Sequence, residues 1–121
     1  MGVFMRQADR LTDEVILRRW ADDEWRPLTW GEMRKSALAI AARLIELGVK
    51  PGDRVILMSE NRIEWLVADI GIQAAAAVTV PVYPSTVART AQLIADNSQA
   101  VLAIAGNQEI AERLPAGGSL K

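Results

Sequence analysis

The sequence contains no cysteine and no histidine. Without cysteine, disulfide bonds and thiolate chemistry are excluded. Without histidine, the chain lacks the commonest general base and metal ligand, together with every catalytic triad that needs an imidazole. Its 14 basic and 15 acidic residues nearly balance, and the net charge is −1. This balance gives no electrostatic reason to expect a nucleic acid or an anionic membrane surface as a partner.

Long hydrophobic runs are also missing. The longest, residues 70–78, is interrupted at Gln73 and is too short to cross a bilayer. The first five residues have no basic start followed by a long apolar core, so we expect no signal peptide and a cytoplasmic location. Half of the 121 residues are hydrophobic and 24% are charged, which is typical of one globular domain or of part of a larger one.

The first half of the sequence predicts a β-hairpin followed by an amphipathic helix. Residues 15–20 and 25–28 are rich in strand-forming side chains and flank a polar turn. Thr29 and Glu32 then form a T-x-x-E capping box, in which each side chain satisfies an otherwise orphan backbone N–H group. Gly48 predicts a left-handed end to this helix. Apolar residues recur at helical spacing between these signals, and the predicted core face comprises Met33, Ala37, Ile40, Ala41, Leu44 and Leu47.

The second half predicts strands that alternate with helices. We expect strands at 54–58, 77–82 and 101–104 and helices at about 62–75, 86–96 and 108–114, with N-caps at Asn61, at Ser85 or Thr86, and at Asn107, and a C-cap at Asn97. The apolar strand at 54–58 predicts burial on both faces of a parallel sheet. Pro81 predicts interrupted pairing. The helix at 62–75 is apolar nearly all round, which predicts burial with one face left for a missing neighbour.

This order of elements sets the predicted fold class. It is α/β: an incomplete doubly wound, Rossmann-like parallel sheet, preceded by a β-hairpin and an amphipathic helix. The crossovers between parallel strands should be right-handed, and the hairpin should lie apart from the parallel sheet.

No phosphate-binding loop of the G-x-G-x-x-G or G-x-x-x-x-G-K-[ST] type is present. The junctions that follow the strands, at 59–61, 83–86 and 105–107, carry residues that cap helices, although helix N-termini also attract anions. Glu60 and Glu64 fit a surface acid and a capping acid better than a catalytic pair. Core packing is favoured over base stacking for the four tryptophans, Trp20, Trp25, Trp30 and Trp65. The residues alone therefore predict an α/β domain without a visible active site.

Four segments resemble motifs of the adenylate-forming (AMP-binding) superfamily. Residues 28–33, LTWGEM, resemble L-T/S-Y/W-x-E-L, and residues 47–55, LGVKPGDRV, resemble L-G-V-x-x-G-D-R-V. Residues 59–65, SENRIEW, resemble S-E/N-N-x-x-E-W, and residues 75–85, AAAVTVPVYPS, resemble A-G-A-V-x-V-P-I/V-Y-P-T/S. Ala76 stands where many members carry glycine. The last two segments are most similar to those of long-chain fatty acyl-CoA synthetases.

The resemblance implies that residues 1–114 are the N-terminal portion of an AMP-binding adenylation domain and that residues 115–121 are a loose tail or truncation point. It implies a parent enzyme several times larger. That enzyme would use ATP and Mg²⁺ to convert a fatty acid to an acyl-adenylate, with release of pyrophosphate, and would then transfer the acyl group to CoA.

The parts that carry this chemistry in the family have no counterpart in the chain. They are the phosphate loop S-G-T-T-G-x-P-K-G, the acidic adenosine-binding residues, the hinge and the C-terminal lysine. The resemblance therefore assigns no catalytic, cofactor-binding or metal-binding residue here, and we expect the chain alone to be inactive and to bind no ATP, Mg²⁺ or CoA.

The partners implied are the fatty acid substrate and the remainder of the same polypeptide, with peripheral membrane association of the parent and no nucleic acid. The isolated chain is expected to self-associate. Two alternatives stay open: another adenylate-forming ligase, such as a fatty acyl-AMP or aryl-CoA ligase, or a stand-alone, non-enzymatic α/β binding module.

Overall fold

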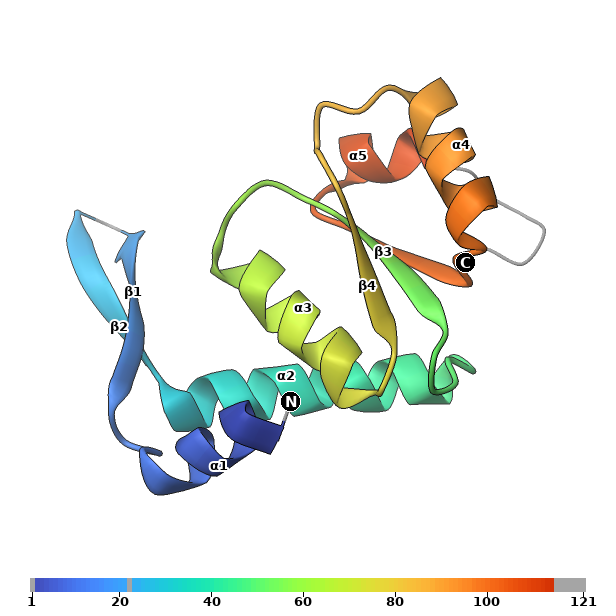
Figure 1. Ribbon diagram of the computed structural model, residues 1–121. Coiled ribbons are helices and arrows are strands. Elements are labelled where there is room, and N and C mark those ends of the chain that lie inside the picture. Colours follow the sequence, from blue (N-terminus) through green and yellow to red (C-terminus); the bar gives the residue numbers. More distant parts are fainter. Residues whose placement is uncertain (1, 22, 115–121) are drawn as a thin grey trace.

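The computed structural model describes residues 2–21 and 23–114 and contains two separate sheets (Figure 1). The predicted tail, residues 115–121, lies outside these ranges. In chain order the elements are α1 (Gly2–Arg10), β1 (Val15–Ala21), β2 (Glu24–Thr29), α2 (Trp30–Glu46), β3 (Arg54–Met58), α3 (Ile63–Ala74), β4 (Val78–Val82), α4 (Ala88–Ser98), β5 (Leu102–Ala105) and α5 (Gln108–Glu112).

The predicted hairpin is confirmed. β1 and β2 pair in antiparallel orientation, with Arg18 opposite Pro27, and they form a sheet of their own. Figure 1 shows this hairpin standing away from the parallel strands, next to the start of α2, as expected from the sequence.

Both ends of α2 follow the predicted chemistry. The Glu32 N–H donates to Thr29 Oγ1 at 3.1 Å, and the Thr29 N–H donates to Glu32 Oε2 at 2.9 Å. At the other end Gly48 has a φ of +97°, which a residue without a Cβ adopts at little cost. The N–H groups of Gly48 and Val49 donate to the carbonyls of Ile45 and Leu44, each at 3.0 Å, which is the Schellman pattern.

The caps of α3 and α4 were predicted wrongly. Arg62 rather than Asn61 occupies the N-cap position of α3, and no side chain caps that helix. Before α4 the Thr86 N–H donates to the Tyr83 carbonyl at 3.0 Å. This closes a turn with Pro84 at its second position, where proline is favoured, so α4 starts only at Ala88. It ends at a left-handed Gln99 instead of Asn97.

The short helix α5 is capped as predicted. The Ile110 N–H donates to Asn107 Oδ1 at 2.8 Å. The side chain of Asn107 thereby satisfies one of the orphan donors at the start of α5.

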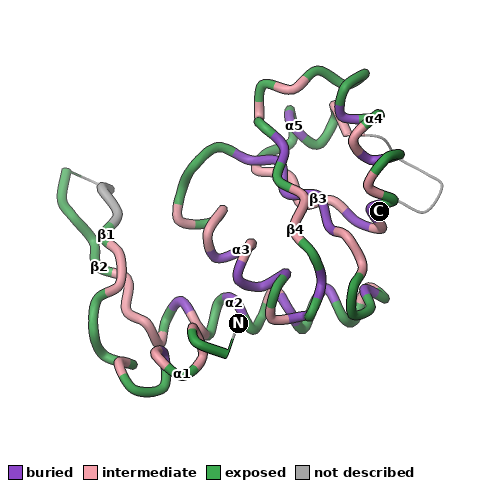
Figure 2. The backbone as a smooth tube through the Cα atoms, in the orientation of Figure 1, coloured by how far each residue is buried: buried purple, intermediate pink, exposed green. Residues whose placement is uncertain are grey.

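The second sheet is parallel and has the order β4-β3-β5, which confirms the predicted fold class. Val55 and Leu57 of β3 pack in one apolar cluster with residues of α2 and α3. Ile56 and Met58 pack in another with residues of α4 and α5. The helices therefore cover both faces of the sheet, and Figure 2 shows the buried residues concentrated around β3 and along α2 and α3.

Pro81 does not interrupt β4, contrary to the prediction. The register continues through it, with Leu57 opposite Pro81 and Met58 opposite Val82. The Val78 N–H donates inward to the Asp53 carbonyl at 2.8 Å, and inward and outward amides alternate along a strand. The nitrogen of Pro81 therefore points to the open edge of the sheet, where no ladder bond is lost.

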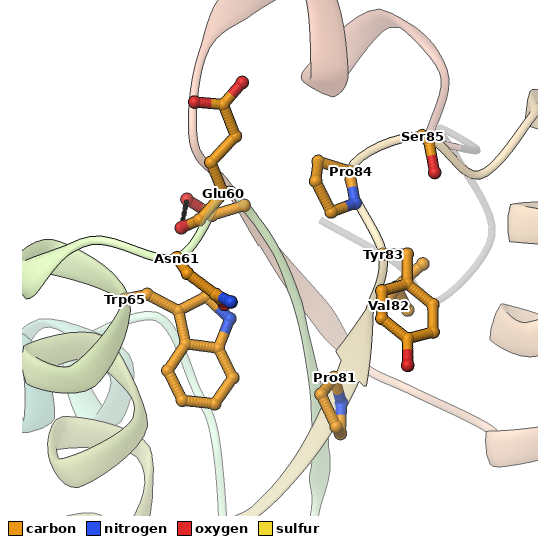
Figure 3. Close-up of a pocket in the computed structure, with 9 residues that line it drawn as sticks. Glu60, Asn61, Trp65, Pro81, Val82, Tyr83, Pro84 and Ser85 are labelled. Carbon is orange, nitrogen blue, oxygen red and sulfur yellow. Dashed lines mark hydrogen bonds between the residues drawn. The ribbon is translucent and has the colours of Figure 1, made fainter.

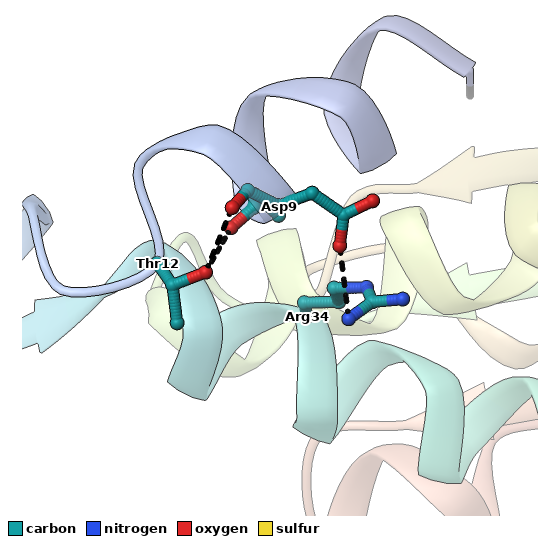
Figure 4. Close-up of polar contacts among 4 residues, drawn as sticks. Asp9, Thr12 and Arg34 are labelled. Atoms are coloured by element: carbon teal, nitrogen blue, oxygen red, sulfur yellow. Dashed lines mark hydrogen bonds and ion pairs between the residues drawn. The ribbon is translucent and has the colours of Figure 1, made fainter.

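Helix α1 was not predicted from the sequence. It docks on α2 through the fully buried Ala8 and through Phe4, whose ring centroid lies 5.6 Å from that of Trp30. Figure 4 shows Asp9 Oδ1 at 3.2 Å from Arg34 Nη1, and the Thr12 hydroxyl donating back to the carbonyl of Ala8 at 2.7 Å. The contacts of Phe4 and Asp9 with α2 are tertiary, whereas the Thr12 bond is local to the end of α1.

Helix α3 has no uncovered apolar face, which corrects the prediction for residues 62–75. It lies between α2 and the sheet, and none of its large apolar side chains is among the exposed ones in the described part of the chain. The two helices approach closely at Gly71. A Cβ placed there would lie 2.7 Å from Ile40 Cγ2 and 3.0 Å from the Ala37 carbonyl oxygen.

We expect Gly71→Ala to destabilise the chain by about 1–3 kcal/mol, because the added methyl group overpacks the contact between α2 and α3. Urea unfolding followed by circular dichroism measures this difference. Gly2→Ala is the matched control, since only a flexible arginine side chain, at 3.5 Å, lies near that position. An equal or higher stability of Gly71→Ala would show that the two helices are not packed this closely.

Candidate functional site

The carboxyl ends of β3 and β4 form the strongest candidate for a binding site. From β3 the chain enters α3, which packs with α2 on one face of the sheet. From the neighbouring β4 it enters α4, which packs on the opposite face. Adjacent strands whose connections leave to opposite faces create a crevice at the edge of the sheet, and open α/β folds bind ligands in such crevices.

A cavity of about 550 Å³ lies at this position. This volume is within the range of small-molecule sites. Figure 3 shows Trp65 of α3 on one side and Tyr83, just after β4, on the other. The lining residues are Ser59, Glu60, Asn61, Trp65, Pro81, Val82, Tyr83, Pro84 and Ser85. We call this site the switch-point crevice.

The wall of the crevice next to β3 is held rigidly. Ser59 is buried, and its hydroxyl donates to the Glu60 carbonyl at 3.2 Å. Gly106 lies against Ser59 so closely that a Cβ on Gly106 would be 2.5 Å from Ser59 Oγ. The Gly106 N–H donates to the Met58 carbonyl at 2.9 Å, and its carbonyl accepts a hydrogen bond from the Arg62 guanidinium. The loops after β3 and β5 are thereby tied together.

Several polar side chains of the crevice keep their hydrogen-bonding capacity. Among residues 2–21 and 23–114, no hydrogen bond or ion pair engages the side chain of Asn61, Tyr83 or Ser85. Tyr83 is 82% exposed although it is an aromatic residue. Unused polar groups beside aromatic and proline rings are typical of ligand sites, in which apolar contacts give affinity and a few polar groups give orientation.

The chemistry of the crevice favours binding over covalent catalysis. Among the described residues its only charged lining side chain is the exposed Glu60 carboxylate, and none of its described lining residues is a lysine or an arginine. No group of three or more His, Cys, Asp or Glu residues in the described part of the chain is placed to hold a metal ion. That the chain carries no catalytic, cofactor-binding or metal-binding residue stays a prediction.

The structure separates the acidic pair considered from the sequence. Glu64 Oε2 lies 3.9 Å from Arg62 Nε, whereas Glu60 lines the crevice. The capping interpretation of the strand–helix junctions is confirmed only at Asn107.

The tryptophans differ in their surroundings. Trp30 contacts Phe4, and the half-buried Trp65 packs against the core cluster of α2 and α3 while it also lines the crevice. Trp25 is 62% exposed, so core packing is wrong for this residue. The side chain of Trp20 lies outside the described part of the chain.

Sequence reasoning missed the crevice itself. Its residues were examined one junction at a time, and no single junction carries a ligand motif. The available signal was the order of strands and helices, since a helix after each of two adjacent parallel strands allows a switch point. The strand order that makes β3 and β4 neighbours could not be read from the sequence.

No helix among the described residues is long and apolar enough to cross a membrane.

Comparison with known proteins places these features in a family. The chain matches the family model described as AMP-binding enzyme over residues 4–120. Over 93 residues it is 40% identical to a long-chain-fatty-acid–CoA ligase of Mycobacterium bovis, FadD15, an alignment that covers 77% of this chain and 16% of the ligase. The chain therefore spans about a sixth of the length of this relative.

Two further similar proteins have names that differ from this one in the acid or in the acceptor. A 3-[(3aS,4S,7aS)-7a-methyl-1,5-dioxo-octahydro-1H-inden-4-yl]propanoyl:CoA ligase of Mycobacterium tuberculosis is 42% identical over 99 residues, which cover 81% of this chain and 20% of that protein. The crystal structure of a fatty acid AMP ligase from Legionella pneumophila superposes with a TM-score of 0.75 at 28% identity, and covers 84% of this chain and 18% of that one.

We expect Gly106→Ala to destabilise the chain by about 1–3 kcal/mol, because its methyl group would overlap Ser59 Oγ and Cβ, at 2.5 and 2.9 Å. The free energy of unfolding in urea measures this loss. Ser59→Gly removes both of those atoms, so the double variant should recover part of the stability that Gly106→Ala loses. Purely additive effects of the two substitutions would contradict the proposed contact.

Proposed function

Because the chain belongs to the AMP-binding enzyme family, we propose that its residues 1–114 are the N-terminal portion of an adenylation domain in an ATP-dependent long-chain fatty acid–CoA ligase. The enzyme would join a fatty acid to AMP, release pyrophosphate and then transfer the acyl group to CoA. As a user of ATP and CoA it would work in the cytoplasm.

The identity to FadD15 of Mycobacterium bovis carries this proposal, because it extends over three quarters of the chain. Two local features add support. The segments at residues 59–65 and 75–85, which resemble long-chain acyl-CoA synthetases, form the two walls of the switch-point crevice. They are therefore neighbours in space as well as in sequence.

The triphosphate and its Mg²⁺ do not fit the switch-point crevice. Among residues 2–21 and 23–114, the only charged side chain in its lining is a carboxylate, which repels phosphate, and no glycine-rich loop lies there to bring backbone N–H groups to an anion. We therefore assign no step of the reaction to this crevice. In the proposed enzyme, ATP, Mg²⁺, CoA and the fatty acid would be held by the part of the polypeptide that this chain does not include.

A fatty acyl-AMP ligase is the second candidate, favoured by the similarity to the Legionella pneumophila enzyme. Both candidates share the adenylation step and differ only in whether CoA accepts the acyl group. The Mycobacterium tuberculosis ligase, whose name contains a propanoyl group with a fused ring system, would share the adenylation step as well. A stand-alone binding module is the third candidate. If the chain is such a module, it should not contribute to the activity of any ligase.

We expect the chain alone to show only background ATP–pyrophosphate exchange with palmitate, because pre-organised donors for the phosphoryl groups are missing. A chimaera should behave differently. In it, residues 4–114 of this chain replace the matched segment of FadD15 from Mycobacterium bovis, and it should form palmitoyl-CoA with release of AMP.

The decisive control is a FadD15 variant without the segment, which should be inactive. A chimaera that folds cooperatively but makes no acyl-adenylate would overturn the proposed role and favour the stand-alone module. A chimaera that makes acyl-adenylate without palmitoyl-CoA would favour the fatty acyl-AMP ligase.

The remainder of the polypeptide is the proposed partner of the open β4 edge, and the isolated chain should self-associate there. Val78 is 49% exposed on this edge, and an uncovered strand edge is a template for pairing. We expect Val78→Lys to raise the dissociation constant of self-association about tenfold or more, because like charges would meet across the pairing. Analytical ultracentrifugation measures it.

Leu93→Lys is the matched control for this effect, since Leu93 is an exposed apolar residue on α4, away from the edge. Its introduced charge should leave self-association nearly unchanged. A wild-type chain that stays monomeric at millimolar concentration would show that the β4 edge needs no partner.

A further inference from the structure

We draw no further inference here: the strongest candidate, the apolar groove between the end of β2 and the start of α3, whose two cavities share the lining residues Leu28 and Ile63, carries none because nothing in the described part of the structure shows what covers it.

Discussion

Burial of strand β3 on both faces is the constraint from which the rest of the parallel unit follows. Val55 and Leu57 point to one apolar cluster, and Ile56 and Met58 point to the other. A strand with no polar face must be covered twice, so the helices divide between the two sides of the sheet. The connections from β3 and β4 then leave to opposite faces, and the switch-point crevice is the geometric result.

The packing around strand β3 also explains where neighbouring segments must lie in close contact. Close contacts without room for a Cβ occur at Gly71, between α2 and α3, and at Gly106, against the residue that follows β3. The contact at Gly71 sets the distance between α2 and α3. The contact at Gly106 sets the position of the crevice wall at Ser59. Both positions therefore couple the packing of the core to the shape of the site, although neither residue is among those that line the crevice.

Regular elements could be predicted because their signals are local. The capping box at Thr29 and the left-handed end at Gly48 each involve a few consecutive residues, and both are as expected. Helix α1 could not be predicted, since it is stabilised by its contact with α2. Pro81 was misjudged because its effect depends on which side of β4 is open, and only the strand order decides that. The crevice was missed for the same reason, as it joins segments that are not consecutive.

The same molecule therefore carries two kinds of information about function. The family motifs lie at helix ends and at strand-to-helix turns, so the segments that identify the relatives are also segments that shape the fold. The crevice, by contrast, carries a single negative charge among the described residues that line it, which disfavours an anionic ligand. Membership of the family thus explains the fold, while the negative charge that the described residues place on this surface does not suit a phosphate-bearing ligand.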